Sequence, residues 1–246
     1  MKLIRYPFVF IPVVLLLLSN STSSLNEKQT GAHILSSSLI NESNKNIDLN
    51  AAILFDKWNL AASGLSKDAF EMAQKGYITL DEKHLLTKNN LLTIIDFSKA
   101  STQKRLFVLD MSTGEMLFNS LVAHGRKSGE NFATDFSNKE ESHKSSLGFY
   151  VTLNTYVGEN GYSLKLKGCE TGINDKAYNR AIVLHGADYV SEKFIQQNGY
   201  LGRSYGCPAV PKVLSKKIID VIKGGSCMFL YYPSKNYSNQ SKILNS

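Results

Sequence analysis

The sequence predicts a mainly β domain with flanking helices, preceded by a small helical subdomain. The first observation behind this prediction is a series of short apolar or alternating segments separated by turn residues, a pattern typical of strands. The second is a helical spacing of apolar residues nearer the N-terminus. The expected strands are Leu91–Phe97, Arg105–Asp110, Glu115–Ala123, Gly148–Tyr156, Ser163–Lys167, Ala181–Leu184 and Met228–Tyr232. With 43% hydrophobic and 20% charged residues, the chain can bury a core, which excludes wholesale disorder.

Apolar residues recur at helical spacing over residues 49–62, which predicts a first helix. A second helix is expected to start at the N-cap Ser66 and to end at Gly76, because glycine is common just beyond the last helical turn. Phe70 is expected to face Trp58, so this helical pair serves packing rather than chemistry. Two later helices are expected at Ser191–Gln197 and Lys212–Lys223.

The N-terminal segment has the layout of a secretory signal peptide. Lys2 and Arg5 precede the apolar run Phe8–Leu18, and small polar residues follow it. Because a bilayer span needs about 20 apolar residues, this run is too short for a comfortable membrane helix, although an uncleaved anchor stays open. The expected organisation is a signal peptide at 1–24, a flexible linker at 25–48, the helical subdomain at 49–90, the main β domain at 91–233 and a disordered tail at 234–246. We therefore expect export to the periplasm or cell envelope, with no stable membrane anchor after cleavage.

The chain carries 28 basic and 21 acidic residues, which give a formal net charge of +7 at pH 7. This charge favours loose attraction to an acidic envelope polymer. The lysines and arginines are scattered rather than clustered and no nucleic-acid-binding motif is present, so we expect no nucleic-acid partner.

The chain has three cysteines, and an odd number in an exported protein leaves at least one without an intramolecular partner. Cys227 lies in an apolar strand-like segment and is interpreted as a buried structural thiol. Cys169 lies in a turn-like segment and has no assigned role. The surroundings of Cys207 are different in kind.

Two segments carry the candidate chemistry: Ile182–Asp188 contains His185, and Gly202–Pro208 contains Cys207. A cysteine nucleophile needs an ionised sulfur, and a nearby histidine can accept its proton. A histidine at a strand end is held by a rigid scaffold while it faces a cleft. The backbone N–H groups expected to form an oxyanion hole belong to Tyr205, Gly206 and Cys207. From composition alone, however, a buried cysteine and a hydrogen-bonded histidine are the more frequent interpretation.

The order His185-Gly186 followed by Ser204-x-Gly206-Cys207 resembles the L,D-transpeptidase (YkuD-like) family, in its murein L,D-transpeptidase catalytic-domain branch. The resemblance extends over about residues 93–232 and implies a β-sandwich that holds cysteine and histidine at a cleft. It implies an acyltransferase that forms a thioester with a peptidoglycan tetrapeptide, releases D-alanine and passes the acyl group to an amine. With water as acceptor, the same site would be an L,D-carboxypeptidase. The resemblance also implies that the Gly186 carbonyl orients His185, and no cofactor or metal is expected.

The sequence departs from the common family pattern at two positions. Many members carry an arginine two residues after the cysteine, where this chain has Ala209, and a histidine where it has Tyr205. Arg203 is our suggested substitute for the missing arginine. The candidate substrate-binding residues are Ser204, Arg203 and His124, with Ser204 also expected to form hydrogen bonds within its own turn.

Three rival interpretations were weighed against the enzyme. A non-catalytic peptidoglycan-binding protein would have no need of a reactive thiol. A papain-like protease would place its cysteine before its histidine, the reverse of the order here. A zinc site is disfavoured because no pair of candidate ligands has close spacing; those candidates are His124, His143, His185 and Cys207. The choice between amine and water, the acceptor stem or protein and the oligomeric state stay open.

Overall fold

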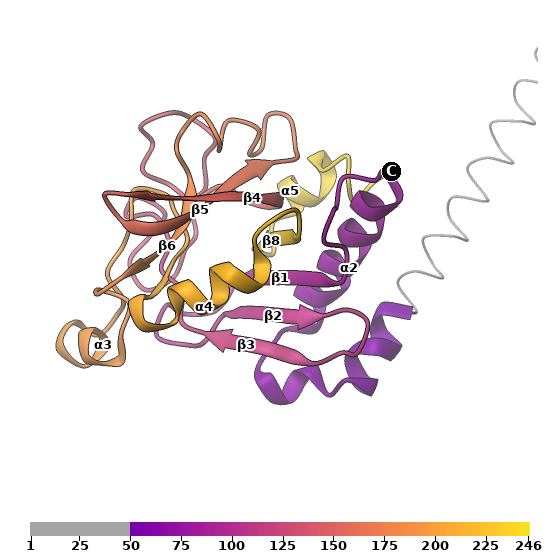
Figure 1. Cartoon of the computed structure of the whole chain (residues 1–246), viewed down its shortest axis with the longest axis horizontal. Coiled ribbons are helices and arrows are strands. Elements are labelled where there is room, and N and C mark those ends of the chain that lie inside the picture. Colours follow the sequence, from indigo (N-terminus) through magenta and orange to yellow (C-terminus); the bar gives the residue numbers. More distant parts are fainter. Residues whose placement is uncertain (1–49) are drawn as a thin grey trace, which may run out of the picture. The chain divides into compact units, whose positions relative to one another are not determined.

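The computed structural model describes residues 50–246 (Figure 1). The predicted signal peptide and linker, residues 1–24 and 25–48, lie outside the described residues. Between residues 50 and 246, no helix is both long and apolar enough to cross a lipid bilayer.

All the predicted strands are present, with shifted ends, and the structure adds the short strand β7 in front of a helix. The strands are β1 (Leu91–Asp96), β2 (Leu106–Asp110), β3 (Met116–Ser120), β4 (Gly148–Gly158), β5 (Gly161–Gly168), β6 (Val183–Ala187), β7 (Ala209–Pro211) and β8 (Cys227–Tyr231). The helices are residues 50–57, the 3-10 helix η1 (Leu60–Ser63), α2 (Lys67–Glu82), α3 (Glu192–Asn198), α4 (Lys212–Ile222) and α5 (Lys235–Gln240).

The strands form one mixed sheet in the order β3-β2-β1-β8-β4-β5-β6-β7. The pairs β1–β8 and β6–β7 are parallel, and the other neighbours are antiparallel. Beyond β3, Ala123 forms an antiparallel bridge to Ala209 in β7, so the two edges of the sheet meet. The mainly β, sandwich-like fold class expected from the sequence is confirmed in this form, as a single sheet that curls until its edges touch.

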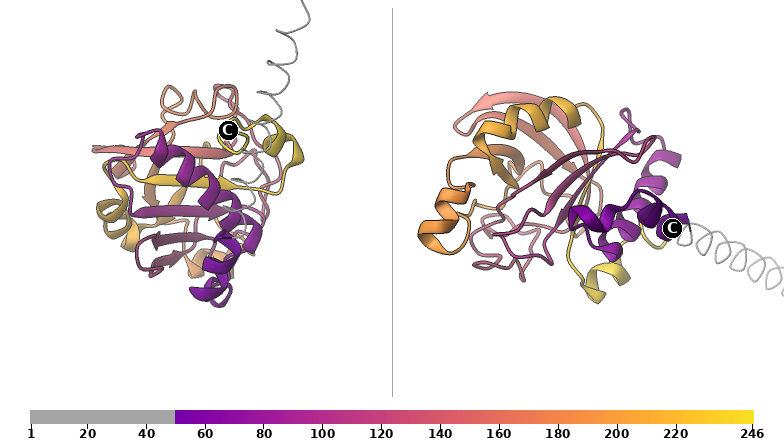
Figure 2. Two further views of the ribbon diagram at one scale, coloured as in Figure 1. Left: turned by 90° about the vertical axis from the view of Figure 1, so that its right-hand side faces the viewer. Right: turned by 90° about the horizontal axis from the view of Figure 1, so that it is seen from below.

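Helices cover both faces of this sheet. In β4, Phe149 contacts the position of Gly76 in α2, whereas the Thr152 hydroxyl donates to the carbonyl of Ile222 at the end of α4 (2.7 Å). Residues three apart in a strand face opposite sides, so α2 and α4 lie on opposite faces, as Figure 2 shows. The central strands β1 and β8 are accordingly buried along their whole length.

The expectation that the second helix ends at Gly76 is wrong, because α2 continues to Glu82. A Cβ at position 76 would lie 2.0 Å from the ring of Phe149, so glycine here lets helix and strand approach closely rather than ending the helix. Trp58 and Phe70 meet edge to face at 6.1 Å, as expected. Phe70 belongs to the same hydrophobic core as the sheet residue Phe229, so the helical segment packs as part of one unit.

The expectation of a disordered tail at residues 234–246 is also wrong. This segment contains α5, and three of its side chains are buried, namely those of Tyr237, Ile243 and Leu244. The Tyr237 hydroxyl donates to the carboxylate of Glu170 (3.0 Å), and so does the Ser241 hydroxyl. Apolar burial and a buried carboxylate therefore hold a segment whose polar composition resembles a free terminus.

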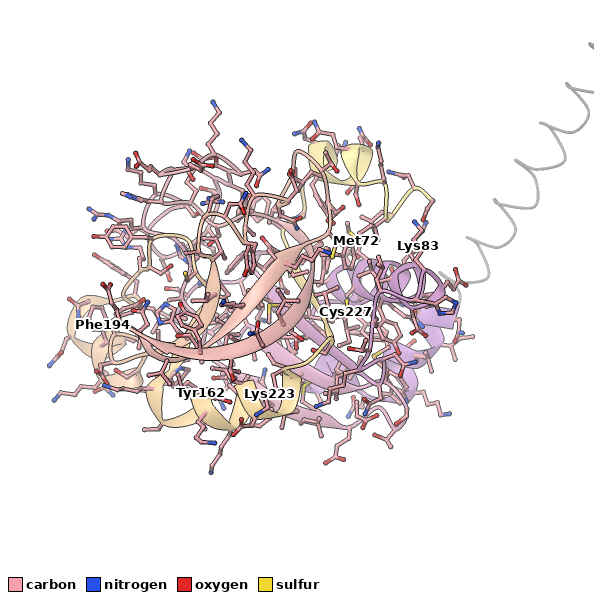
Figure 3. All side chains as sticks on the ribbon, turned by 45° about the horizontal axis from the view of Figure 1, so that its top comes forward. Met72, Lys83, Tyr162, Phe194, Lys223 and Cys227 are labelled. Carbon is pink, nitrogen blue, oxygen red and sulfur yellow. The ribbon has the colours of Figure 1, made fainter. Side chains whose placement is uncertain are left out.

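Polar contacts attach the outer face of α4 to the sheet. The Tyr162 hydroxyl of β5 donates to Asp220 (2.8 Å), and the ammonium of Lys223 donates to the same carboxylate (2.7 Å). Tyr162 and Lys223 are labelled in Figure 3, where Cys227 lies in the interior of the sheet. These contacts help to fix α4, the helix that follows β7 and packs on β6.

Candidate active site

Strand pairing brings Cys207 beside the segment that carries His185. The parallel pair β6–β7 aligns His185 with Ala209, and Cys207 comes two residues before Ala209. Val183 comes two residues before His185 in β6, and its backbone N–H donates to the Cys207 sulfur at 3.4 Å. Cysteine and histidine thus come from two neighbouring chain segments at one end of the sheet.

His185 is 3% exposed and held in one tautomer. Its Nδ1 lies 3.1 Å from the carbonyl oxygen of Gly186. A carbonyl can only accept, so Nδ1 carries the proton and Nε2 keeps its lone pair. Burial lowers the pKa of His185, which keeps the ring neutral and able to accept a proton. The contact expected between Gly186 and His185 is therefore present.

The Cys207 thiol is half-buried and rests against backbone. It donates to the carbonyl of Ala181 at 3.7 Å, and within residues 50–246 no hydrogen bond joins it to His185. Burial raises the pKa of the Cys207 thiol, while the Val183 N–H and the charge of Arg180 act in the opposite direction. The resting pair is a neutral thiol and a neutral imidazole, and catalytic contacts commonly shorten only when substrate binds.

The turn before Cys207 is built around Ser204. The Ser204 hydroxyl donates to the Cys207 carbonyl at 2.6 Å and accepts from the Gly206 N–H at 3.0 Å. Gly206 has φ +124°, and a Cβ there would lie 2.8 Å from the Lys144 carbonyl oxygen. Only glycine fits this conformation and this spacing without strain. As expected, Ser204 binds within its own turn; at 6% exposure it has little surface to offer a substrate.

One of the three predicted oxyanion-hole donors is already engaged, because the Gly206 N–H donates to Ser204. The N–H groups of Tyr205 and Cys207 have no hydrogen-bond partner in the described part of the chain. We therefore restrict the predicted oxyanion hole to Tyr205 and Cys207.

Residues 61–231 match the sequence model of the L,D-transpeptidase catalytic domain. The chain belongs to this family. No curated protein shows significant sequence similarity to it.

Three solved L,D-transpeptidases illustrate the structural likeness. One from Mycobacterium smegmatis has 12% identity and a TM-score of 0.37, with 58% of this chain and 59% of that chain covered. One from Stackebrandtia nassauensis has 12% identity and a TM-score of 0.36, with 68% of each chain covered. One from Enterococcus faecium has 12% identity and a TM-score of 0.36, with 58% of this chain and 50% of that chain covered. This L,D-transpeptidase domain thus spans about 59% of the first relative.

The structure gives His124 a structural place, in contrast to the predicted contact with substrate. His124 is fully buried, with Nδ1 accepting from the guanidinium of Arg105 (2.7 Å) and Nε2 donating to the carbonyl of Gly129 (3.3 Å). Burial, followed by the charge of Arg105, lowers the pKa of His124 to about 3. Both ring nitrogens are occupied, which leaves none for a substrate.

The two residues at the outer side of the turn differ in exposure. Arg203 donates to the Gly129 carbonyl at 3.2 Å and lies over the ring of Tyr200 at 5.2 Å, so its guanidinium is partly occupied. Tyr205 is 64% exposed and flanked by His143, with ring centroids 4.6 Å apart, and by the guanidinium of Arg126. Tyr205 is therefore the most accessible side chain next to the nucleophile in this L,D-transpeptidase domain.

Sequence reasoning missed Arg180, although its guanidinium lies 3.3 Å from the position that a Gly206 Cβ would occupy. The available signal was a charged residue directly before the apolar strand that carries His185. The expected strand began one residue later, at Ala181, and Arg180 was given no role. Arg180 is the charged group that acts on Cys207 in the described residues.

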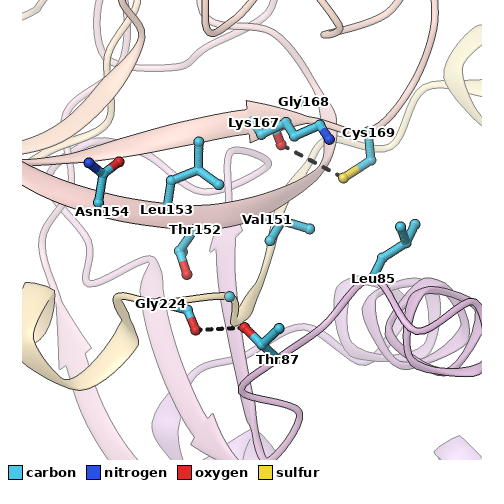
Figure 4. Close-up of a pocket in the computed structure, with 11 residues that line it drawn as sticks. Leu85, Thr87, Val151, Thr152, Leu153, Asn154, Lys167, Gly168, Cys169 and Gly224 are labelled. Carbon is cyan, nitrogen blue, oxygen red and sulfur yellow. Dashed lines mark hydrogen bonds between the residues drawn. The ribbon is translucent and has the colours of Figure 1, made fainter.

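Cys169 lies at a separate pocket of about 600 Å³ formed by β4, β5 and the Gly224–Gly225 turn (Figure 4). Cys169 lies six positions after Ser163, the strand partner of His185, which is about 20 Å of extended chain. Burial raises the pKa of Cys169 to about 12, so this thiol is a poor nucleophile at neutral pH. Cys169 is therefore a suitable control for experiments on Cys207.

Proposed function

We propose that this L,D-transpeptidase domain is a cysteine acyltransferase of peptidoglycan stem peptides, with Cys207 as nucleophile and His185 as its base. The observation that carries the proposal is the parallel β6–β7 pairing, which sets the Cys207 sulfur against Val183 and aligns His185 with the same strand end. A half-buried thiol beside a neutral histidine of fixed tautomer is the arrangement that general-base activation of sulfur needs.

In the first step, His185 Nε2 accepts the proton of Cys207 Sγ, and the thiolate attacks the carbonyl carbon at the L-centre of the third stem residue. The tetrahedral oxyanion receives hydrogen bonds from the free backbone N–H groups of Tyr205 and Cys207, each worth a few kcal/mol in such sites. The carbon–nitrogen bond to D-alanine then breaks, and the protonated His185 gives its proton to the leaving amine. The product is a thioester on Cys207.

In the second step, an acceptor amine attacks the thioester carbonyl, and His185 removes a proton from that amine. The bond to sulfur breaks, and the Cys207 thiolate regains the proton from His185. Gly186 keeps Nε2 available throughout by accepting from Nδ1. Water in place of the amine would release a tripeptide and give L,D-carboxypeptidase activity. Such a substrate lies in the envelope, which agrees with the export expected from residues 1–24.

The test is mass spectrometry of the purified protein after incubation with a disaccharide-tetrapeptide under reducing conditions. We expect a thioester adduct, released D-alanine and either a cross-linked dimer or a tripeptide. Cys207→Ala should abolish all of these products, whereas Cys169→Ala, which removes the other half-buried thiol, should leave them unchanged. The dimer-to-tripeptide ratio distinguishes amine from water as acceptor.

The proposal fails if wild-type protein forms neither adduct nor product, or if Cys207→Ala keeps the activity. A protein that retains peptidoglycan in a sedimentation assay but forms no adduct would instead be the non-catalytic binder.

A further inference from the structure

Arg180 contacts the loop of residues 137–146 (the 137–146 loop), which lies beside the turn of residues 204–207 that carries Cys207. Its Nη1 donates to the Ser137 carbonyl (2.8 Å) and to the Ser146 hydroxyl (2.7 Å). Its Nη2 donates to the Ser142 hydroxyl (3.1 Å) and to the Lys144 carbonyl (2.8 Å). A half-buried guanidinium with four donated hydrogen bonds is held in one orientation, because its fork geometry fixes all of the donors at once.

The loop that Arg180 holds forms one side of the turn at Gly206. The Lys144 carbonyl oxygen would lie only 2.8 Å from a Cβ at position 206, and Arg180 Nη2 only 3.3 Å. The neighbouring Ser145 hydroxyl donates to the Gly206 carbonyl (3.2 Å) and accepts from the Gly125 N–H (3.0 Å). Arg180 therefore reaches the residue before the nucleophile both directly and through this loop.

The residues that follow Arg180 contact the sulfur itself. Ala181 has φ +53°, a left-handed conformation that L-residues other than asparagine and aspartate adopt rarely. In this backbone the Ala181 carbonyl accepts a hydrogen bond from the Cys207 thiol, and the Val183 N–H donates a hydrogen bond to the Cys207 sulfur. The charge, the carbonyl and the N–H thus come from three residues within the stretch 180–183, and rare backbone geometry of this kind is concentrated at functional sites.

We propose that Arg180 is a positioning residue for the nucleophile: its guanidinium holds the 137–146 loop against the turn and supplies the positive charge that favours the Cys207 thiolate. The inference rests on the proposed function only in taking Cys207 as the nucleophile. Arg203, the substitute that the sequence suggested for the missing family arginine, directs its guanidinium to Gly129 instead.

Two titratable residues of this region, His185 and Tyr189, are neutral at pH 7. Burial lowers the pKa of His185, and burial raises the pKa of Tyr189 to about 12. Arg180 is charged, and its charge opposes the effect of burial on the pKa of Cys207. An opposite charge at close range typically lowers such a pKa by one unit or more. Removing the charge of Arg180 should therefore move the titration of Cys207 measurably.

The experiment measures the rate of iodoacetamide alkylation at Cys207 against pH, by mass spectrometry of the peptide that contains it. This readout needs no peptidoglycan substrate, so it stays informative even if the proposed reaction is wrong. The variants are Arg180→Gln, which removes the charge, Arg180→Lys, which keeps it, and the matched control Arg203→Gln. Thermal unfolding establishes that each variant is folded.

We expect Arg180→Gln to raise the apparent pKa of Cys207 by about one unit, which slows alkylation about tenfold below that pKa. Arg180→Lys should restore most of the wild-type profile, and Arg203→Gln should match it. A folded Arg180→Gln protein with the wild-type profile would overturn the proposal. If Arg180→Gln does not fold, Arg180→Met, which also removes the charge, takes its place: a rise of about one unit in the apparent pKa of Cys207 supports the proposal, and the wild-type profile overturns it.

Discussion

Replacing Gly206 by alanine tests whether the nucleophile turn depends on a backbone that only glycine can adopt. Gly206 has φ +124°, and the added Cβ would lie 2.8 Å from a backbone oxygen, that of Lys144, and 3.0 Å from Ile182 Cδ1. A backbone atom cannot rotate away, so the turn or the 137–146 loop must move. The matched control is Gly199→Ala, since Gly199 also has positive φ (+82°) but open space around its Cβ position.

The two substitutions differ in cost by a calculable amount. At Gly199, alanine meets only the left-handed backbone penalty, about 1–2 kcal/mol. At Gly206 the backbone strain is about 1–3 kcal/mol, and overpacking adds about 1–3 kcal/mol. We therefore expect Gly206→Ala to lower the free energy of unfolding by about 2–6 kcal/mol. That cost leaves a domain of typical stability, about 5–15 kcal/mol, folded in most of this range.

Urea unfolding gives the stabilities, and alkylation of Cys207 at fixed pH reports the position of the thiol. We expect Gly206→Ala to lose more stability than Gly199→Ala and to change the alkylation rate, while Gly199→Ala keeps the wild-type rate. Equal losses of stability in the two variants, with unchanged alkylation of Cys207, would show that the turn tolerates a side chain and that our account of it is wrong.

Three further predictions concern the turn, the buried histidine and the C-terminus. Ser204→Ala removes two hydrogen bonds within the turn, so we expect a loss of about 1–3 kcal/mol in unfolding free energy and slower thioester formation. Ser204→Thr keeps the hydroxyl and should therefore keep the wild-type stability and the wild-type rate of thioester formation. Equal behaviour of the two variants would refute the role of the hydroxyl. Because His124 has a pKa of about 3 when folded and about 6.5 when unfolded, its contribution to stability is complete above pH 6.5 and falls by about 2 kcal/mol at pH 5. Urea unfolding at several pH values should show a smaller loss of stability toward low pH in His124→Gln than in the wild type. An equal loss in both proteins would contradict the buried, neutral state of His124. Tyr237→Phe combined with Ser241→Ala removes two hydrogen bonds to the buried Glu170, and we expect a loss of about 3 kcal/mol in stability, against which a change below 0.5 kcal/mol would count.

Local patterns were sufficient for most of the fold and for the family. The alternation and apolar runs that predicted strands such as Gly148–Tyr156 are consequences of burial on a sheet, and the structure buries the first five residues of this strand. The spacing of Cys207 and His185 carried a family signal, and the family is now established by the match over residues 61–231. Neither prediction depended on how distant segments meet.

The predictions that failed all depended on contacts between distant segments. Gly76 resembles a helix end, but its neighbour is Phe149, which is remote in sequence. His124 resembled a polar loop residue, and only the buried Arg105 explains its position. The one local sign at Arg180, a charge directly before an apolar strand, did not indicate its partners, because the loop that it holds precedes it by some 40 residues and carries no motif. Such pairings leave no trace in the periodicity of a single sequence.

The bridge between Ala123 and Ala209 has a consequence for how the protein matures. It joins segments 86 residues apart, and the short strand that follows the nucleophile has β6 on one side and this bridge on the other. Ordering that strand requires a long loop to close, which is among the slower and entropically costlier events in folding. A newly made chain would hold an unorganised thiol at Cys207 until the sheet edges meet. Reactivity at Cys207 would then appear only with the closure of the sheet.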